Sequence, residues 1–271
     1  MQDSSLPSDH HLVKFTNCYL VQPDDGNLTG RAAALWVDRR SGTIAHMSLE
    51  DQSVGISFET GAAEDQVYTR AALASAPTID LEGHILAPGM IDIQINGAYG
   101  VDFSHWPGSE ADYVRAVKRV SASLLETGVT AYLPTIIVSV VSASGEVNCN
   151  LWTGPTQSQT PDMYRQIIPT LHRLAINSKG HKERESCQVV GYHLEGPFLS
   201  PAKIGCHPLD NAKTACEGWR SFIQTYSEAI IEITEERELA KLVTIAPEVM
   251  GVMDTVPRLV EEGFSVSIGH S

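Results

Sequence analysis

The first 87 residues alternate between short apolar runs and polar turns. Apolar and β-branched residues dominate VKFTNCYLV (13–21), AAALWVD (32–38) and TIAHM (43–47), and the turn RRSG separates the last two runs. Two further runs, TIDL (78–81) and HILA (84–87), lie on either side of a Glu-Gly pair. Short strands divided by glycine and polar residues are typical of small β-domains. We therefore predict a small β-sandwich-like domain over residues 1–87.

From residue 88 onward, apolar runs alternate with segments of helix length. We predict strands at 90–96, 129–137, 187–195, 242–248 and 264–270, and helices at 109–126, 161–178, 216–231 and 251–262. The first helix carries apolar residues close to intervals of three and four, so this stripe should face the sheet; its residues are Tyr113, Val114, Val117, Val120, Leu124 and Leu125. The alternation predicts βαβ units, which form a parallel sheet covered by helices.

Two segments, 49–76 and 142–162, lack any sustained period. We expect the first to form an exposed excursion, and the second, which is rich in Ser, Thr, Gly and Asn, to be a loop insertion. Pro134 and Pro247 lie late in predicted strands, where a missing backbone N–H is expected to end regular pairing.

Polar residues follow several of the predicted strands and favour one α/β architecture over another. Gln94 and Asn96 end the first strand, and Glu195, Glu248 and His270 end three later ones. Polar groups at the carboxyl ends of successive parallel strands are typical of a TIM-type barrel rather than an open doubly wound sheet. Because a full barrel has eight strands, residues 88–271 are expected to form an incomplete barrel of about five β/α units.

The composition argues against nucleic acids and anionic membranes as binding partners. The 271 residues carry a formal charge of −14 with a pI near 5.1, whereas nucleic acids and anionic membranes require dense basic surfaces. The start MQDSSLPSDHHL resembles no secretory signal, and no apolar run reaches the length of a membrane span, so we expect a cytoplasmic protein. Five cysteines without C-x-x-C spacing indicate reduced thiols rather than a cysteine zinc site.

The strand-end residues suggest metal chemistry but leave alternatives open. Glu195 and His270 supply the O and N donors that zinc accepts, while a solitary strand-end glutamate is more commonly solvated or salt-bridged. Gln94 and Asn96 could equally satisfy backbone groups. His193 should share a sheet face with Glu195, and we expect it to support the site rather than bind the metal.

The blocks ILAPGMIDIQINGAYGVDF, GVTAYLPTIIVS, GYHLEGPFLSPAKIGCHP, VTIAPE and VSIGHS resemble, in this order, the N-acetylglucosamine-6-phosphate deacetylases of the amidohydrolase superfamily. The most specific of them are HLEGPF and the GCHP that follows it. The resemblance implies a single divalent metal, usually zinc, bound by Glu195, by His270 and by a further histidine. Many amidohydrolases have His-x-His on the first strand where this chain has Gln94 and Asn96. Because carboxamides bind zinc poorly, a second metal would lack ligands there, which fits one bound metal rather than two.

The same resemblance implies a substrate site. His207 matches a loop histidine that contacts substrate, and Cys206 stands where the family contacts substrate through the backbone. The implied reaction is hydrolysis of the acetamide of N-acetylglucosamine 6-phosphate to glucosamine 6-phosphate and acetate, in a protein that forms homodimers in some relatives. The general-base aspartate, the other ligand histidine and the phosphate-binding residues are expected beyond residue 271, as in a C-terminally truncated chain that is inactive by itself. The alternatives are a non-catalytic product and an amidohydrolase acting on a cyclic amide.

Overall fold

A computed structural model describes residues 11–21, 28, 33–49, 68–137, 161–178, 186–205, 207, 209–226 and 239–271. The chain divides into two compact units, Met1–Pro88 and Gly89–Ser271. Most of the predicted excursion at 49–76 and nearly all of the predicted insertion at 142–162 lie outside the described residues. Within the described part, no helix is long and apolar enough to span a membrane.

The first unit is built on a mixed sheet in the order β3-β2-β1-β4, with β5 also paired to β1. Its strands are β1 (Leu12–Leu20), β2 (Ala33–Asp38), β3 (Thr43–Leu49), β4 (Thr78–Asp80) and β5 (Ile85–Leu86). The register of β1 shifts between Phe15 and Cys18, where Asn17 has a φ of 52°. The bulge lets one strand serve two partners, because the half before it pairs with β4 and the half after it with β5.

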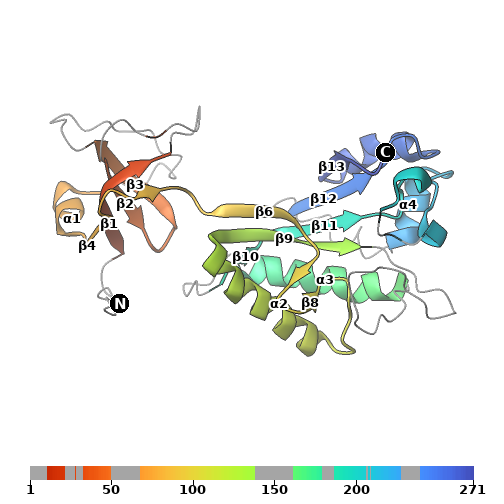
Figure 1. Cartoon of the computed structure of the whole chain (residues 1–271), viewed down its shortest axis with the longest axis horizontal. Coiled ribbons are helices and arrows are strands. Elements are labelled where there is room, and N and C mark those ends of the chain that lie inside the picture. Colours follow the sequence, from red (N-terminus) through yellow and green to blue (C-terminus); the bar gives the residue numbers. More distant parts are fainter. Residues whose placement is uncertain are drawn as a thin grey trace. The chain divides into compact units, whose positions relative to one another are not determined.

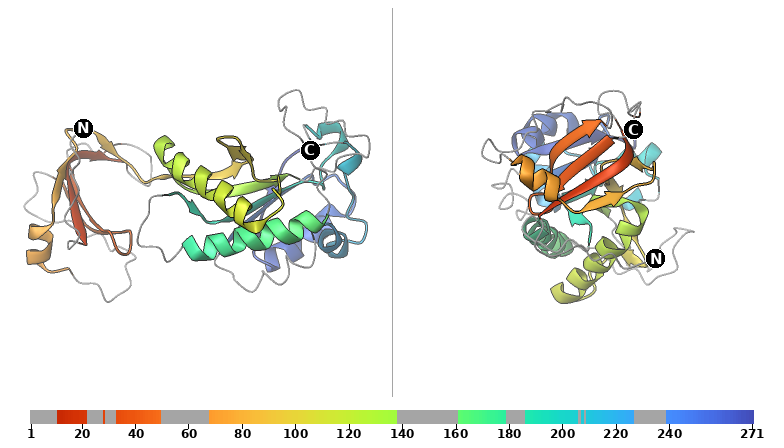
Figure 2. Two further views of the ribbon diagram at one scale, coloured as in Figure 1. Left: turned by 90° about the horizontal axis from the view of Figure 1, so that it is seen from below. Right: turned by 90° about the vertical axis from the view of Figure 1, so that its left-hand side faces the viewer.

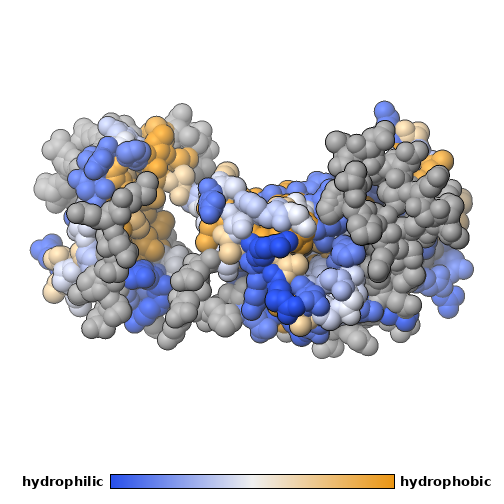
Figure 3. All heavy atoms as spheres, turned by 60° about the horizontal axis from the view of Figure 1, so that its bottom comes forward, coloured by the Kyte–Doolittle hydropathy of each residue, from blue (hydrophilic) through white to orange (hydrophobic). Residues whose placement is uncertain are grey.

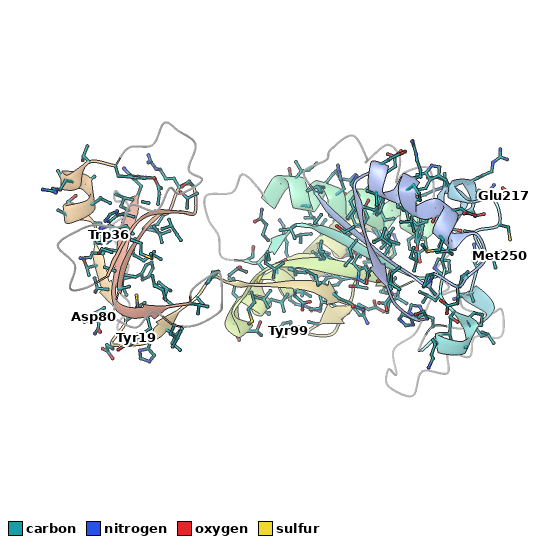
Figure 4. All side chains as sticks on the ribbon, turned by 90° about the horizontal axis from the view of Figure 1, so that it is seen from above. Tyr19, Trp36, Asp80, Tyr99, Glu217 and Met250 are labelled. Carbon is teal, nitrogen blue, oxygen red and sulfur yellow. The ribbon has the colours of Figure 1, made fainter. Side chains whose placement is uncertain are left out.

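The described strands of this unit form a single mixed sheet, and apolar residues are buried on both of its faces. Alternate residues of a strand point to opposite faces. Accordingly, Ala34 and Trp36 pack in one apolar cluster, while Ala33 and Leu35 pack in another. The short helix α1 (Arg70–Ser75) covers the Trp36 side and accepts a 2.8 Å hydrogen bond from the Trp36 indole at the Leu73 carbonyl (Figure 4). α1 lies in the segment 49–76 that was predicted to form an exposed excursion, and none of its residues is buried.

Asp38, fully buried at the end of β2, gives this unit a sensitivity to acid. Burial raises the pKa of its carboxyl. Hydrogen bonds from the Arg40 side chain and backbone and from the Tyr68 hydroxyl have the larger, opposite effect, and the resulting pKa is about 2. Since the folded pKa lies below the unfolded value near 3.9, this stabilisation is complete above about pH 4 and is lost as the pH falls toward 2.

We expect Asp38→Asn to lower the free energy of unfolding at pH 7 by about 2 kcal/mol. The variant should also lose this contribution to the pH dependence between pH 4 and 2. Urea unfolding followed by tryptophan fluorescence measures this loss, with Trp36 the reporter in residues 1–88 and the tryptophans at 106, 152 and 219 the reporters in the second unit. An unaltered acid sensitivity in the variant would exclude Asp38 as its origin.

The second unit contains the predicted parallel sheet, and its fold is an incomplete TIM-type barrel (Figure 1). The strands lie in the order β6-β9-β11-β12-β13, with β10 beside β9. Their bounds are β6 (Met90–Ile95), β9 (Val129–Ile137), β10 (Gln188–Val189), β11 (Gly191–Glu195), β12 (Ala240–Ile245) and β13 (Phe264–Ile268). Spatial order therefore follows chain order, as in a β/α barrel.

Helices cover the outer face of this sheet (Figures 1 and 2). They are α2 (Glu110–Leu124), α3 (Pro161–Ser178), α4 (Trp219–Tyr226) and α6 (Val252–Glu261), with single 3-10 turns η1 (Leu125–Thr127), η2 (Pro201–Lys203) and η3 (Leu209–Asn211). Four residues of the predicted stripe, Tyr113, Val117, Val120 and Leu124, are buried in the main core with Tyr192 and Leu194 of β11. Val114 is only partly buried, and Leu125 is exposed in η1. Since Tyr192 and Leu194 face the helices, His193 and Glu195 face the inside of the barrel.

Three details differ from the sequence prediction. The run 187–195 is two strands, since Val190 lies between β10 and β11. Pro134 does not end its strand but lies within β9, opposite Ile95, where the pairing with β6 has an irregular register. A short hairpin, β7 (Gly97–Ala98) and β8 (Val101–Asp102), follows β6. Hydrophobic and hydrophilic residues are interspersed on the surface shown in Figure 3. Within β6, the apolar side chains of Met90, Ile91 and Ile93 are exposed.

Candidate metal centre

Glu195, His207 and His270 form a cluster at the carboxyl ends of the barrel strands. Glu195 is the last residue of β11, His270 follows β13 by two residues, and His207 lies on the loop after η2. One donor atom from each lies within 4.8 Å of the others. The Oε1 atom of Glu195 is 2.9 Å from Nε2 of His270 and 3.7 Å from Nε2 of His207. The structure thus brings together three side chains from distant parts of the sequence.

The loop after Glu195 is tied to the ends of the neighbouring strands. Gly196 turns the chain with a φ of 77°. The backbone N–H of Ala246 then donates to the Phe198 carbonyl at 2.9 Å, and the N–H of Ser200 donates to the His270 carbonyl at 3.1 Å. A side chain at residue 205 would lie 3.3 Å from the His270 ring, so Gly205 allows the loop to pass close to it. These contacts fix His270 against the loop that carries His207.

The partners of His270 prepare one of its nitrogens to bind a cation. Its Nδ1 lies 2.9 Å from the Lys203 carbonyl oxygen, which can only accept, so Nδ1 carries the proton. In the neutral ring Nε2 is then an acceptor facing a carboxylate oxygen, an arrangement that only a shared proton or a metal cation makes favourable. A histidine whose other nitrogen donates to a carbonyl is also the usual form of a metal-bound imidazole.

His207 has no hydrogen-bond partner at either ring nitrogen among the described residues, although its side chain is only 2% exposed. An unpaired buried polar group carries a free-energy cost, so such a ring in a functional site normally awaits a ligand. The ring meets that of His270 edge to face, with centroids 5.2 Å apart. Its position is therefore suited to contact a metal ion or a substrate held beside Glu195.

The Glu195 carboxyl is ionised at neutral pH even though it is buried. Burial raises its pKa, but the His207 and His270 rings, through a proton or positive charge directed at Oε1, outweigh burial and lower the pKa to about 2; a bound cation would supply the same positive charge. A carboxylate and imidazole nitrogens are ligand types that zinc accepts. The donor set, the tautomer of His270 and the unpartnered His207 together fit a divalent cation.

Comparisons with known proteins give one consistent family. No family model matches the chain. The chain is 31% identical over 262 residues to the N-acetylglucosamine-6-phosphate deacetylase of Caenorhabditis elegans, covering 97% of this chain and 50% of that protein. It is 33% identical over 272 residues to the protein of the same name from Danio rerio, covering 100% of this chain and 52% of the relative. Over nearly its whole length the chain is similar to N-acetylglucosamine-6-phosphate deacetylases.

The chain spans about half the length of the curated deacetylases it matches. Among solved structures, the deacetylase from Pasteurella multocida superposes with a TM-score of 0.62 at 23% identity, covering 96% of this chain and 51% of that one. A mutant deacetylase from Mycobacterium smegmatis, solved in complex with N-acetyl-D-glucosamine-6-phosphate, superposes with a TM-score of 0.54 at 18% identity and covers 96% of this chain and 50% of that one. At these identities, the structural comparisons support the fold.

The two amides at the carboxyl end of the first barrel strand, Gln94 within β6 and Asn96 directly after it, have different surroundings. Gln94 donates from Nε2 to Oε2 of Glu195 at 3.1 Å, across the intervening strand β9. Asn96 is exposed, and within the described part of the chain its side chain makes no hydrogen bond to the cluster. The sequence analysis left open that both side chains form hydrogen bonds to backbone groups. The contact between Gln94 and Glu195 could not be foreseen, because it joins residues 101 positions apart.

The remaining candidate residues differ in burial and in their distance from the cluster. Glu248 is exposed, three residues beyond the end of β12, and is not part of the cluster. Asp102, in the hairpin after β6, has a pKa raised by burial and accepts a 2.8 Å bond from the Ser104 backbone N–H. Cys206 lies outside the described residues. His193 is fully buried, and its ring nitrogens lie within hydrogen-bond distance of the hydroxyls of Thr135 and Thr244.

Proposed function

We propose that this chain forms the metal-holding part of an active site that hydrolyses the acetamide of N-acetylglucosamine 6-phosphate. The observation that carries the proposal is the cluster of Glu195, His207 and His270 at the strand ends of a chain similar to these deacetylases. Glu195 and His270 would hold a single divalent cation, which we propose is zinc because the donors are one carboxylate and imidazole nitrogen.

A bound zinc ion would supply polarisation of the amide carbonyl and a more acidic water. The residues of this chain orient and supply the site around it. Oε1 of Glu195 and Nε2 of His270 provide the donor atoms, and the Lys203 carbonyl keeps the proton of His270 on Nδ1. We propose that His207, whose ring nitrogens have no hydrogen-bond partner among the described residues and whose Nε2 lies 3.7 Å from Oε1 of Glu195, donates to the substrate and orients its acetamide.

Deprotonation of water and protonation of the leaving amine need a further acid and base. Among the described residues, the cluster contains no carboxylate besides Glu195. We therefore propose no general base within residues 1–271. The polypeptide 1–271 by itself is expected to release no acetate.

A chimera tests the proposed reaction. Residues 1–271 are joined at residue 271 to the part of the Danio rerio relative that they do not match, and acetate release from N-acetylglucosamine 6-phosphate is measured with and without zinc. We expect zinc-dependent release from the chimera and none from residues 1–271. A folded, zinc-loaded chimera that is inert would refute the proposed substrate. Turnover of a cyclic amide instead would favour an amidohydrolase that acts on cyclic amides. Release by residues 1–271 alone would place the base among them, with Glu248 and Asp102 the first to test.

The role of His207 is tested separately in the same chimera. If it contacts substrate, His207→Ala should leave the zinc content unchanged and lower kcat/KM by about 10- to 100-fold, the effect of a lost polar contact worth roughly 1.5–3 kcal/mol. Metal analysis and steady-state kinetics distinguish the two roles. Loss of zinc together with activity would make His207 a metal ligand.

A further inference from the structure

We propose that Gln94 is a positioning residue that makes Glu195 a ligand through one oxygen only. This inference rests on the proposed metal site and adds a role for an amide that the sequence pattern treats only as a replaced ligand. The amide nitrogen of Gln94 donates to Oε2 of Glu195, whereas both histidines approach Oε1. The two carboxylate oxygens of Glu195 therefore have separate partners.

The orientation of the Gln94 amide follows from its partner. An ionised carboxylate can only accept hydrogen bonds, so the atom that faces Oε2 at 3.1 Å must be the amide nitrogen. A glutamine that ligated a cation would instead turn its oxygen toward the ion, since an amide N–H₂ is no metal ligand. The contact with Glu195 thus assigns Gln94 to orientation of the ligand and not to the coordination shell.

The fold gives this hydrogen bond a specific effect. β6 and β11 both flank β9, so Gln94 and Glu195 approach each other across the strand between them. Without the amide, the Glu195 side chain could rotate to offer both oxygens to a cation. With it, Oε2 is engaged and Oε1 remains beside Nε2 of His270 and the unpaired nitrogens of His207. One carboxylate oxygen leaves more coordination positions for water and substrate than two would.

The test compares three variants of the 1–271 chain. Gln94→Leu removes the donor at similar size, and Gln94→Glu replaces the donor with an acceptor of the same shape. Asn96→Leu is the matched control, two residues further on and directly after the end of the same strand. Zinc affinity is measured by competition with a chromophoric chelator. Coordination number is measured from the visible absorption of the cobalt(II)-substituted chain. Circular dichroism checks that each variant is folded.

We expect Gln94→Leu to weaken zinc binding by about 10-fold, at the lower end of the effect of removing a residue that orients a ligand. Its cobalt absorption should weaken, because a two-oxygen carboxylate raises the coordination number. Gln94→Glu should also bind zinc more weakly than the unaltered chain, and Asn96→Leu should match the unaltered chain in both readouts.

Three results would overturn the assignment. Unchanged affinity and cobalt spectrum in Gln94→Leu would show that the hydrogen bond orients nothing. Tighter zinc binding by Gln94→Glu would show that the side chain at 94 is itself a ligand. An equal loss in Asn96→Leu would show that the effect belongs to the strand and not to the amide. Absence of zinc binding by the unaltered chain would instead refute the metal site proposed above, and this role with it.

Discussion

Glu195→Gln is expected to weaken zinc binding by about 100-fold or more. The substitution keeps the size of the side chain but replaces the charged Oε1, which faces His270 at 2.9 Å, with a neutral amide atom. Carboxamides are poor zinc ligands, and the loss of a ligand exceeds the 10- to 100-fold typical of a residue that only supports one. The same variant places two amides in contact, so the bond from Gln94 becomes weaker as well.

Glu248→Gln is the matched control for this prediction. It makes the same chemical change at the exposed residue beyond the end of the adjacent strand β12. Competition with a chromophoric chelator gives the zinc affinity of both variants. We expect the Glu248 variant to bind zinc as the unaltered chain does. Equal affinities in the Glu195 variant and the unaltered chain would make Glu195 a structural residue.

His193→Leu is expected to lower the free energy of unfolding of the second unit by about 2–5 kcal/mol. The imidazole lies between the hydroxyls of Thr135 at 3.0 Å and Thr244 at 2.8 Å, so that one ring joins β11 to both of its neighbours. All three side chains are buried, and burial lowers the pKa of His193, so that the ring is neutral at pH 7. Leucine would leave two buried hydroxyls without this partner, at roughly 1–3 kcal/mol each.

A triple variant separates lost hydrogen bonds from lost packing. Adding Thr135→Val and Thr244→Val to His193→Leu removes the two unpaired hydroxyls, and part of the lost stability should return because all partners are then apolar. Chemical unfolding of the single, double and triple variants measures this coupling. Additive losses would show that the two threonines do not depend on the ring.

Much of the barrel could be predicted from sequence because its elements have strong local signals. The strand 129–137 and the helix 161–178 have the predicted bounds, and the apolar stripe of α2 faces the core. Local reasoning did not suffice where long-range pairing decides. Pro134 remains in β9 because strands on both sides hold it in the sheet, and α1 forms beneath Trp36 within a segment that has no period of its own.

The site was predictable in its residue types but not in its contacts. The strand-end positions of Glu195 and His270 indicated that they would converge, since carboxyl ends of parallel strands meet at one edge. The proton position on His270 depends on a carbonyl 67 residues away, and the second oxygen of Glu195 depends on Gln94, 101 residues away. No local pattern encodes such pairs, so these details required the folded structure.

The location of the metal is the central claim, and anomalous diffraction measures it directly. Crystals of the chain grown with zinc would be measured at energies above and below the zinc absorption edge. The proposed site predicts one strong anomalous peak beside Oε1 of Glu195 and Nε2 of His270, at about 2.0–2.2 Å from each. A fully occupied peak elsewhere, or no peak beside these two atoms at saturating zinc, would contradict it.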